Sequence, residues 1–288
     1  MTASVCQLID CSFAYAGVFA LSGINLSFQA GKMYGLIAPN GGGKTTLVNL
    51  LAGHAHPDAG RILIHGRDAR EYKKRELAHL LALTPQHFPI DFPFSVEEVV
   101  MMGRHPHIPR FASPSDKDRR IVDDAMARLD VKHLRQRLLP HLSGGERQRV
   151  MVARALAQET GILLMDEATA NLDIRHALDI MAVLRQKVDE GRTVIAAIHD
   201  LDMAAAFCDE LMVLRQGQVY AQGPASQIMT ETMLAEVFQV EARVDREAAR
   251  TRVRFRLQVT GDRGQVAGDK PRGHGSDAVS AQESEKSI

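Results

Sequence analysis

The sequence predicts an α/β fold with a mainly parallel sheet, and three observations support this prediction. Segments with the pattern of strands alternate with segments with the pattern of helices, as in a parallel sheet covered by helices. The continuous apolar runs at residues 162–165 and 194–198 are typical of strands buried on both faces. A glycine-rich loop at residues 38–45 joins an apolar strand to a helix, which is how such a sheet binds ligands at its edge.

Periodicity identifies the elements of the first part of the chain. Residues 5–9 and 23–28 alternate apolar and polar side chains, as strands of a half-exposed sheet do. A helix is expected at residues 45–52, because Gly53 suits the position just past a helix C-terminus. Three further strands are expected, at residues 32–38, 61–65 and 80–84.

The middle of the chain has the pattern of helices. The proline-rich connector 85–114 contains a short helix at residues 96–102, which begins with a capping box formed by Ser95 and Glu98. Longer helices are expected at residues 115–129 and 144–158. Another helix, between the two buried strands, has one apolar face, made of Ala177, Ile180, Met181, Leu184 and Val188.

The C-terminal region has two different compositions. In residues 252–260, apolar residues alternate with arginines, which predicts a strand with Val253, Phe255, Leu257 and Val259 on one face, paired with residues 238–244. From residue 261 onward apolar residues are scarce, so disorder is expected. The predicted domains are a core of residues 1–86 and 160–240, an inserted helical subdomain of residues 87–159, a β-hairpin of residues 241–260 and a disordered tail of residues 261–288.

Composition excludes several classes of protein. Lys+Arg and Asp+Glu both number 35, so no net charge attracts the chain to nucleic acid. The three cysteines, Cys6, Cys11 and Cys208, make no disulfide framework and lack the paired spacing of a zinc site, which fits a reducing cytosol. No apolar run approaches the roughly 20 residues of a membrane span, and no signal peptide is expected. A membrane role therefore requires partners.

The glycine-rich loop predicts a phosphate site. Ala38-Pro39-Asn40-Gly41-Gly42-Gly43-Lys44-Thr45 matches the phosphate-loop pattern except at its first position. Glycines let backbone N–H groups converge on phosphate oxygens, Lys44 reaches the outer phosphates, and the Thr45 hydroxyl is available to Mg²⁺. If Ala38 requires a positive φ, alanine costs about 1 kcal/mol there, whereas at negative φ it costs nothing. The sequence leaves both alternatives open.

Two adjacent carboxylates follow a buried strand. Asp166 ends the apolar run 162–165, where its carboxylate can approach Mg²⁺ through water. Glu167 points elsewhere and is the candidate general base for an attacking water molecule. A buried carboxylate pair without a function would be costly, so these residues are predicted to be functional, Asp166 at the metal and Glu167 as the base.

A third motif identifies a family. Leu142-Ser143-Gly144-Gly145-Glu146 lies between the phosphate loop and the run that ends in Asp166-Glu167. In this order the motifs resemble the ATP-binding cassette family over about residues 5–240. The resemblance implies a P-loop NTPase (RecA-like) core with an antiparallel β subdomain and an inserted α-helical subdomain. It also implies ATP hydrolysis with Mg²⁺ as cofactor.

The resemblance assigns further site residues. Tyr15 matches the aromatic residue that stacks on adenine, Gln86 the glutamine that touches Mg²⁺ and the attacking water, and His199 the histidine that contacts the γ-phosphate. Glu167, His199 and Gln86 are therefore the catalytic residues, and Thr45, Gln86 and Asp166 the metal ligands. The residues implied to hold ATP are Tyr15, Ala38, Pro39, Asn40, Gly41, Gly42, Gly43, Lys44, Thr45, Thr46, Ser143, Gly144 and Gly145.

The resemblance also implies a homodimer. In the family, the segment at Ser143 binds the γ-phosphate held by the opposite protomer. Ala170-Asn171-Leu172-Asp173 matches the loop that crosses the dimer interface. Two ATP molecules are therefore expected between two chains.

Two looser matches suggest a branch of the family. One is the ending, with Gln216-Gly217-Gln218-Val219, Gly223-Pro224, the segment from Leu234 to Phe238 and a small hairpin, and the other lies in the middle of the chain. The run from Phe92 to Val100, followed by Met101-Met102-Gly103-Arg104-His105-Pro106-His107, looks like the ATPase subunits of importers for iron-siderophores, haem and vitamin B12. The prediction is an iron-siderophore importer ATPase, with a haem or cobalamin importer, or a soluble non-transport ATPase, as alternatives. The implied partners are a polytopic permease and, indirectly, a substrate-binding protein, but no nucleic acid. The implied location is peripheral, at the cytoplasmic face of the inner (plasma) membrane.

Overall fold

The computed structural model describes residues 4–86, 92–170, 172–247 and 250–255. Contacts between Cα atoms group the chain up to Arg256 into one compact unit. Asn171, the end of the predicted hairpin at residues 256–260 and the predicted tail of residues 261–288 lie outside the described residues. The predicted division of the unit into a core and a helical subdomain stays a prediction.

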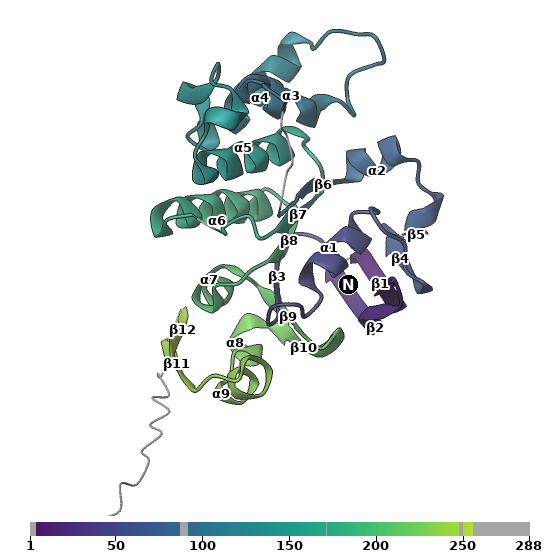
Figure 1. Ribbon diagram of the computed structural model, residues 1–288, viewed down its shortest axis with the longest axis vertical. Helices are drawn as coiled ribbons and strands as arrows, with labels where there is room; N and C mark the ends of the chain where they lie inside the picture. The colour runs from purple at the N-terminus through teal and green to yellow at the C-terminus, as the bar shows by residue number, and fades with distance from the viewer. Residues whose placement is uncertain (1–3, 87–91, 171, 248–249, 256–288) are drawn as a thin grey trace, which may run out of the picture. The chain divides into compact units, whose positions relative to one another are not determined.

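Two sheets organise this unit (Figure 1). The larger has the strand order β10-β9-β3-β8-β7-β6, in which β10 is an antiparallel edge strand and the other strands run parallel. Its strands are β3 (Met33–Ile37), β6 (Leu81–Thr84), β7 (Ile162–Asp166), β8 (Thr193–Ala197), β9 (Glu210–Arg215) and β10 (Gln218–Pro224). The smaller sheet is antiparallel, in the order β2-β1-β4-β5, with β1 (Ser4–Tyr15), β2 (Val18–Gln29), β4 (Ala59–Ile64) and β5 (Arg67–Asp68).

The helices that periodicity predicts are present with small shifts at their ends. The capping box of Ser95 and Glu98 begins α3, as predicted, and the predicted apolar face is the buried face of α6. Helix α2 was not predicted, because it buries none of its residues and so lacks an apolar period. The helices are α1 (Lys44–Leu51), α2 (Lys74–Leu80), α3 (Val96–Met101), α4 (Asp116–Arg128), α5 (Gly144–Ala157), α6 (Ile174–Asp189), α7 (Leu201–Phe207), α8 (Ala225–Ile228) and α9 (Glu231–Met233).

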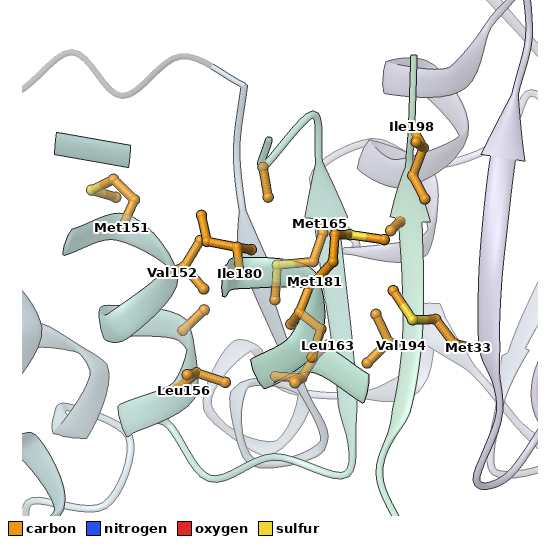
Figure 2. Close-up of a cluster of buried hydrophobic side chains, with 14 of the residues drawn as sticks. Met33, Met151, Val152, Leu156, Leu163, Met165, Ile180, Met181, Val194 and Ile198 are labelled. Carbon is orange, nitrogen blue, oxygen red and sulfur yellow. The ribbon is translucent and has the colours of Figure 1, made fainter. Parts of the chain in front are cut away.

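The larger sheet separates two apolar cores, because successive side chains of a strand point to opposite faces. On β7, Leu163 and Met165 belong to the core that contains α3 to α7, whereas Ile162 and Leu164 belong to the core that contains α1 and the smaller sheet. Figure 2 shows Met151, Val152 and Leu156 of α5 and Ile180 and Met181 of α6 beside Leu163, Met165 and Val194 of the strands. The apolar runs predicted to be buried on both faces are therefore confirmed.

A buried arginine joins the helices next to this sheet. Arg104, 3% exposed, donates from Nε to Asp118 Oδ1 at 2.9 Å and from Nη1 to the carbonyl oxygen of Ala157 at 2.8 Å. A second contact from Nη1 reaches Glu159 at 3.0 Å. The guanidinium therefore ties the start of α4 to the end of α5.

The C-terminal hairpin has the predicted pairing but different strand ends. Its strands are β11 (Ala242–Glu247) and β12 (Arg250–Phe255). The predicted pairing of residues 252–260 with 238–244 is confirmed where Ala242, Arg243 and Val244 pair with Phe255, Arg254 and Val253. Phe238 ends a π-helical turn (Leu234–Phe238), because Leu234 and Val237 are buried there and hold the turn against the core. Among the described residues, no helix is long and apolar enough to cross a membrane.

Candidate functional site

The topology of the larger sheet positions the site. The carboxyl ends of β3, β6, β7 and β8 lie at one edge because these strands are parallel. The phosphate loop follows β3, Gln86 follows β6, Glu167 follows β7 and His199 follows β8. Residues far apart in the sequence therefore meet at this edge.

The phosphate loop has the backbone that its glycines allow. Gly41 and Gly43 have φ values of 74° and 100°, in the left-handed region that favours glycine. Ala38 does not have a positive φ, so alanine is free of backbone strain at this first position of the motif. The buried Lys44 donates from Nζ to the carbonyl oxygen of Ala38 at 2.9 Å, which folds its side chain back over the loop.

Buried charges surround the start of α1. Asp166, 3% exposed at the end of β7, accepts a hydrogen bond from the Thr45 hydroxyl at 3.2 Å. Burial raises the pKa of Asp166, although the Thr45 hydrogen bond opposes the shift. Burial lowers the pKa of Lys44, and the charges of Glu167 and Asp166 oppose that change. A cation next to Asp166 would compensate the buried charge of this carboxylate.

Glu167 is held from two sides. Gln86 donates from Nε2 to Glu167 Oε2 at 2.6 Å, and Nε2 of His199 lies within hydrogen-bond distance of Oε1. The φ of Glu167 is 54°, a strained value for a non-glycine residue that costs on the order of 1 kcal/mol or more. Backbone strain of this kind persists when the surrounding structure imposes it. Here the strained backbone conformation directs the Glu167 carboxylate between Gln86 and His199.

A cavity of about 490 Å³ connects these groups, and it includes one residue that sequence reasoning missed. Ala20 of β2 lines it, with its carbonyl oxygen 3.1 Å from the place where a Cβ on Gly43 would lie. An alanine in a strand gives no signal in the sequence, so only the tertiary structure reveals this contact. The lining residues are Ala20, Asn40, Gly41, Gly42, Gly43, Lys44, Thr45, Thr46, Gln86, Glu167 and His199.

Some predicted site residues do not line this cavity. Tyr15, at the end of β1, is 51% exposed and packs edge-to-face on Phe13, with ring centroids 4.8 Å apart. Its predicted contact with adenine stays a prediction. The segment Ser143-Gly144-Gly145 begins α5, where Ser143 Oγ accepts from Glu146 N and Glu146 accepts from Ser143 N. These three residues are not among those that line the cavity beside Lys44 in their own chain.

The comparisons with known proteins identify the family. A family model described as "ABC transporter" matches residues 21–170. The chain belongs to the ABC transporter family. As an ABC ATPase, it binds and hydrolyses ATP.

Curated relatives of this ABC ATPase include two groups. The hemin import ATP-binding protein HmuV of Thermobifida fusca (strain YX) is 40% identical over 233 residues, which are 81% of each chain. The cobalamin import ATP-binding protein BtuD of Halobacterium salinarum is 41% identical over 235 residues, which are 81% of this chain but 58% of that protein.

Solved structures show the same cassette. An inward-facing structure of a putative metal-chelate type ABC transporter aligns with a TM-score of 0.74 and 27% identity, over 88% of this chain and 96% of that one. A dimeric structure of a bacterial ABC transporter cassette aligns with a TM-score of 0.70 and 26% identity, over 76% and 98% of the two chains. The predicted P-loop NTPase fold is therefore confirmed.

The residues of this ABC ATPase fit Mg²⁺. Mg²⁺ prefers oxygen ligands and usually takes only one or two from the protein, with phosphates and water as the others. Thr45 Oγ1 and Asp166 Oδ1 converge at 3.2 Å beside the cavity, and the amide of Gln86 lies on its wall. Within the described ranges no group of three or more His, Cys, Asp and Glu side chains could hold a metal ion.

Proposed function

We propose that this ABC ATPase drives an importer of a metal chelate, and that haem or cobalamin is its cargo. Support comes from the relatives at 40% and 41% identity, which are named for hemin and cobalamin. The structural likeness to a metal-chelate transporter extends over most of both chains. An iron-siderophore, the substrate predicted from the sequence, belongs to the same chemical class and is the competing candidate.

The cavity supports a role for each site residue. The loop from Asn40 to Thr46 holds the phosphates, with Lys44 on the outer ones. Thr45, Asp166 and Gln86 hold Mg²⁺, which supplies charge neutralisation to the phosphates. Glu167 accepts the proton of the attacking water. His199 contacts both the γ-phosphate and the Glu167 carboxylate and keeps them in position relative to each other.

The double contact on Glu167 constrains this step. Both carboxylate oxygens are engaged, one by Gln86 and one by His199. Each carboxylate oxygen can accept a second hydrogen bond, so Glu167 can accept a proton from water while Gln86 and His199 stay in place. The two contacts therefore orient the carboxylate for this step.

The working form is a homodimer in this proposal. Ser143 and Gly144 are exposed and lie outside the lining of their own cavity, so they are free to complete the site of a second copy. Ile174 and Leu178 of α6 are 76% and 42% exposed beside Asp173, an apolar surface that a second copy covers. The dimer attaches to permease subunits at the cytoplasmic face of the membrane, and a substrate-binding protein delivers the cargo.

Reconstitution tests the proposal. The chain is co-expressed with its permease, purified and placed in proteoliposomes, and ATP hydrolysis is measured with haem, cobalamin or a ferric siderophore and the cognate binding protein. Stimulation by haem or cobalamin alone supports the proposal. Stimulation by the siderophore alone assigns the chain to the competing substrate, and failure to co-purify with a permease favours a soluble non-transport ATPase.

A further inference from the structure

The C-terminal hairpin is held at both edges by carboxylates. Val244 of β11 and Val253 of β12 are cross-strand partners. The backbone N–H of Val253 donates to Asp202 Oδ1 at 2.7 Å, and that of Val244 donates to Glu231 Oε1 at 3.2 Å. Both N–H groups point away from the opposite strand, as in a non-hydrogen-bonded pair of an antiparallel ladder. On each outer edge of the hairpin, a backbone N–H group therefore donates to a carboxylate from a helix.

The two acceptors belong to different helices. Asp202 lies in the first turn of α7, and Glu231 lies in the first turn of α9. Helix α7 begins directly after His199, with Asp200 as N-cap accepting from Met203 N at 3.0 Å. Only two residues, Asp200 and Leu201, separate Asp202 from His199. The hydrogen bond to Val253 is thus made by the first turn of the helix that follows the histidine of the site.

Helix α7 depends on its neighbours for its position. It has seven residues, too few for a helix to be stable by itself. Its buried residues Leu201 and Ala204 share a core with Val253, which is 5% exposed, and β12 lies along α7 (Figure 1). Asp202 therefore fixes α7 on its outer side, while the core fixes its inner side.

We infer that Asp202 is a positioning residue, and that its hydrogen bond to β12 holds the start of α7 so that His199 meets Glu167. This inference rests on the proposed roles of His199 and Glu167. The hydrogen bond is charge-assisted, about twice as strong as a neutral one, and it acts where α7 begins. Only the contact between Asp202 and β12 affects the site in this way, and the hairpin itself lies outside the cavity.

The chain offers a matched control for the test. Asp202→Ala removes the acceptor at the β12 edge, and Glu231→Ala removes the equivalent acceptor at the β11 edge, which belongs to α9 and not to the helix that follows His199. Asp202→Asn keeps an acceptor oxygen and loses the charge. For each full-length variant, kcat and KM for ATP hydrolysis and the melting temperature are measured. The His199 imidazole signal is recorded by ¹⁵N NMR and assigned with His199→Ala.

The expected result separates position from stability. Asp202→Ala lowers kcat about tenfold with little change in KM and shifts the His199 signal, because a small displacement of a reacting group is costly. Asp202→Asn restores most of kcat. Glu231→Ala lowers the melting temperature by a similar amount but leaves kcat and the His199 signal unchanged.

Two outcomes overturn the inference. One is an unchanged His199 signal in Asp202→Ala. The other is an equal loss of kcat in Asp202→Ala and Glu231→Ala that follows the loss of melting temperature, which makes the hairpin a stability element only. If His199→Ala itself hydrolyses ATP normally, the proposed role of His199 fails, and the NMR comparison still decides whether Asp202 positions it.

Discussion

Ala38 and Gly42 share a space in the phosphate loop that holds one methyl group. A Cβ built on Gly42 would lie 2.7 Å from the Cβ of Ala38, closer than real Cβ atoms approach one another. The φ of Gly42 is not positive, so backbone conformation alone does not require glycine there. The motif has glycine at position 38, where this chain has alanine. The methyl group of Ala38 therefore fits because position 42 is glycine and carries none.

This relationship predicts a coupled pair of mutations. Gly42→Ala overpacks the loop and should weaken ATP binding about tenfold, since overpacking costs about 1–3 kcal/mol. Ala38→Gly alone should leave ATP affinity nearly unchanged. In the double variant the nearest contact of the new methyl is the carbonyl oxygen of Pro39 at 3.0 Å, so most of the affinity should return.

Calorimetric titration with ATP in the four proteins of this cycle measures the coupling. Gly43→Ala is a useful control, because Gly43 has φ 100° and its Cβ would meet Leu21 and Ala20. Ala38→Gly should not rescue that variant. Additive effects of Ala38→Gly and Gly42→Ala would show that the two positions do not compete for space.

A second prediction concerns Glu167. Glu167→Gln keeps the size of the side chain but removes the base, so ATP should still bind while turnover falls about 10²–10⁴-fold. Equilibrium ATP binding and single-turnover hydrolysis measure the two properties separately. Hydrolysis at a near-native rate would assign the base to another group.

A third prediction separates dimer assembly from chemistry. Ser143→Arg should abolish hydrolysis but leave ATP binding to the monomer intact, because Ser143 lies outside the cavity at Lys44. Lys44→Ala should weaken ATP binding directly. In a heterodimer of the two variants, one composite site is whole and the other is doubly damaged.

The heterodimer is prepared with two affinity tags, and its hydrolysis is compared with that of each homodimer. Partial activity in the mixture alone supports composite sites if one whole site suffices. A loss of monomer affinity in Ser143→Arg as large as in Lys44→Ala contradicts the proposed division of roles.

A fourth prediction concerns stability at low pH. The hydrogen bond from the Ser115 side chain, opposed by burial and supported by Arg104, lowers the pKa of Asp118 to about 2. A depressed folded-state pKa stabilises the fold above the unfolded value of about 4, and this stabilisation is lost as pH falls from about 4 to about 2. Urea unfolding at several pH values should therefore show a weaker acid dependence in Asp118→Asn. Equal acid dependence in both proteins would mean that Asp118 does not titrate with folding.

Local interactions made parts of the fold predictable. The Ser95 cap, Gly53 just past the end of α1 and the apolar face of α6 depend on residues within a few positions of each other. Short-range hydrogen bonds and the 3.6-residue period of a helix can be recognised from residues that are close together in the sequence. Strand ends were less predictable. The first strand of the C-terminal hairpin begins at Ala242, after a π-helical turn that the buried Leu234 and Val237 hold against the core.

The sequence by itself determined the chemistry available to this protein: a phosphate loop, an Asp166-Glu167 pair after a buried strand, and His199 after another. Only the tertiary structure decided that Gln86, Glu167 and His199 touch, that Ala20 lines their cavity and that Ala38 is unstrained. These contacts join residues up to 81 positions apart. They depend on strand order and on the packing of two cores against one sheet, which no local pattern contains.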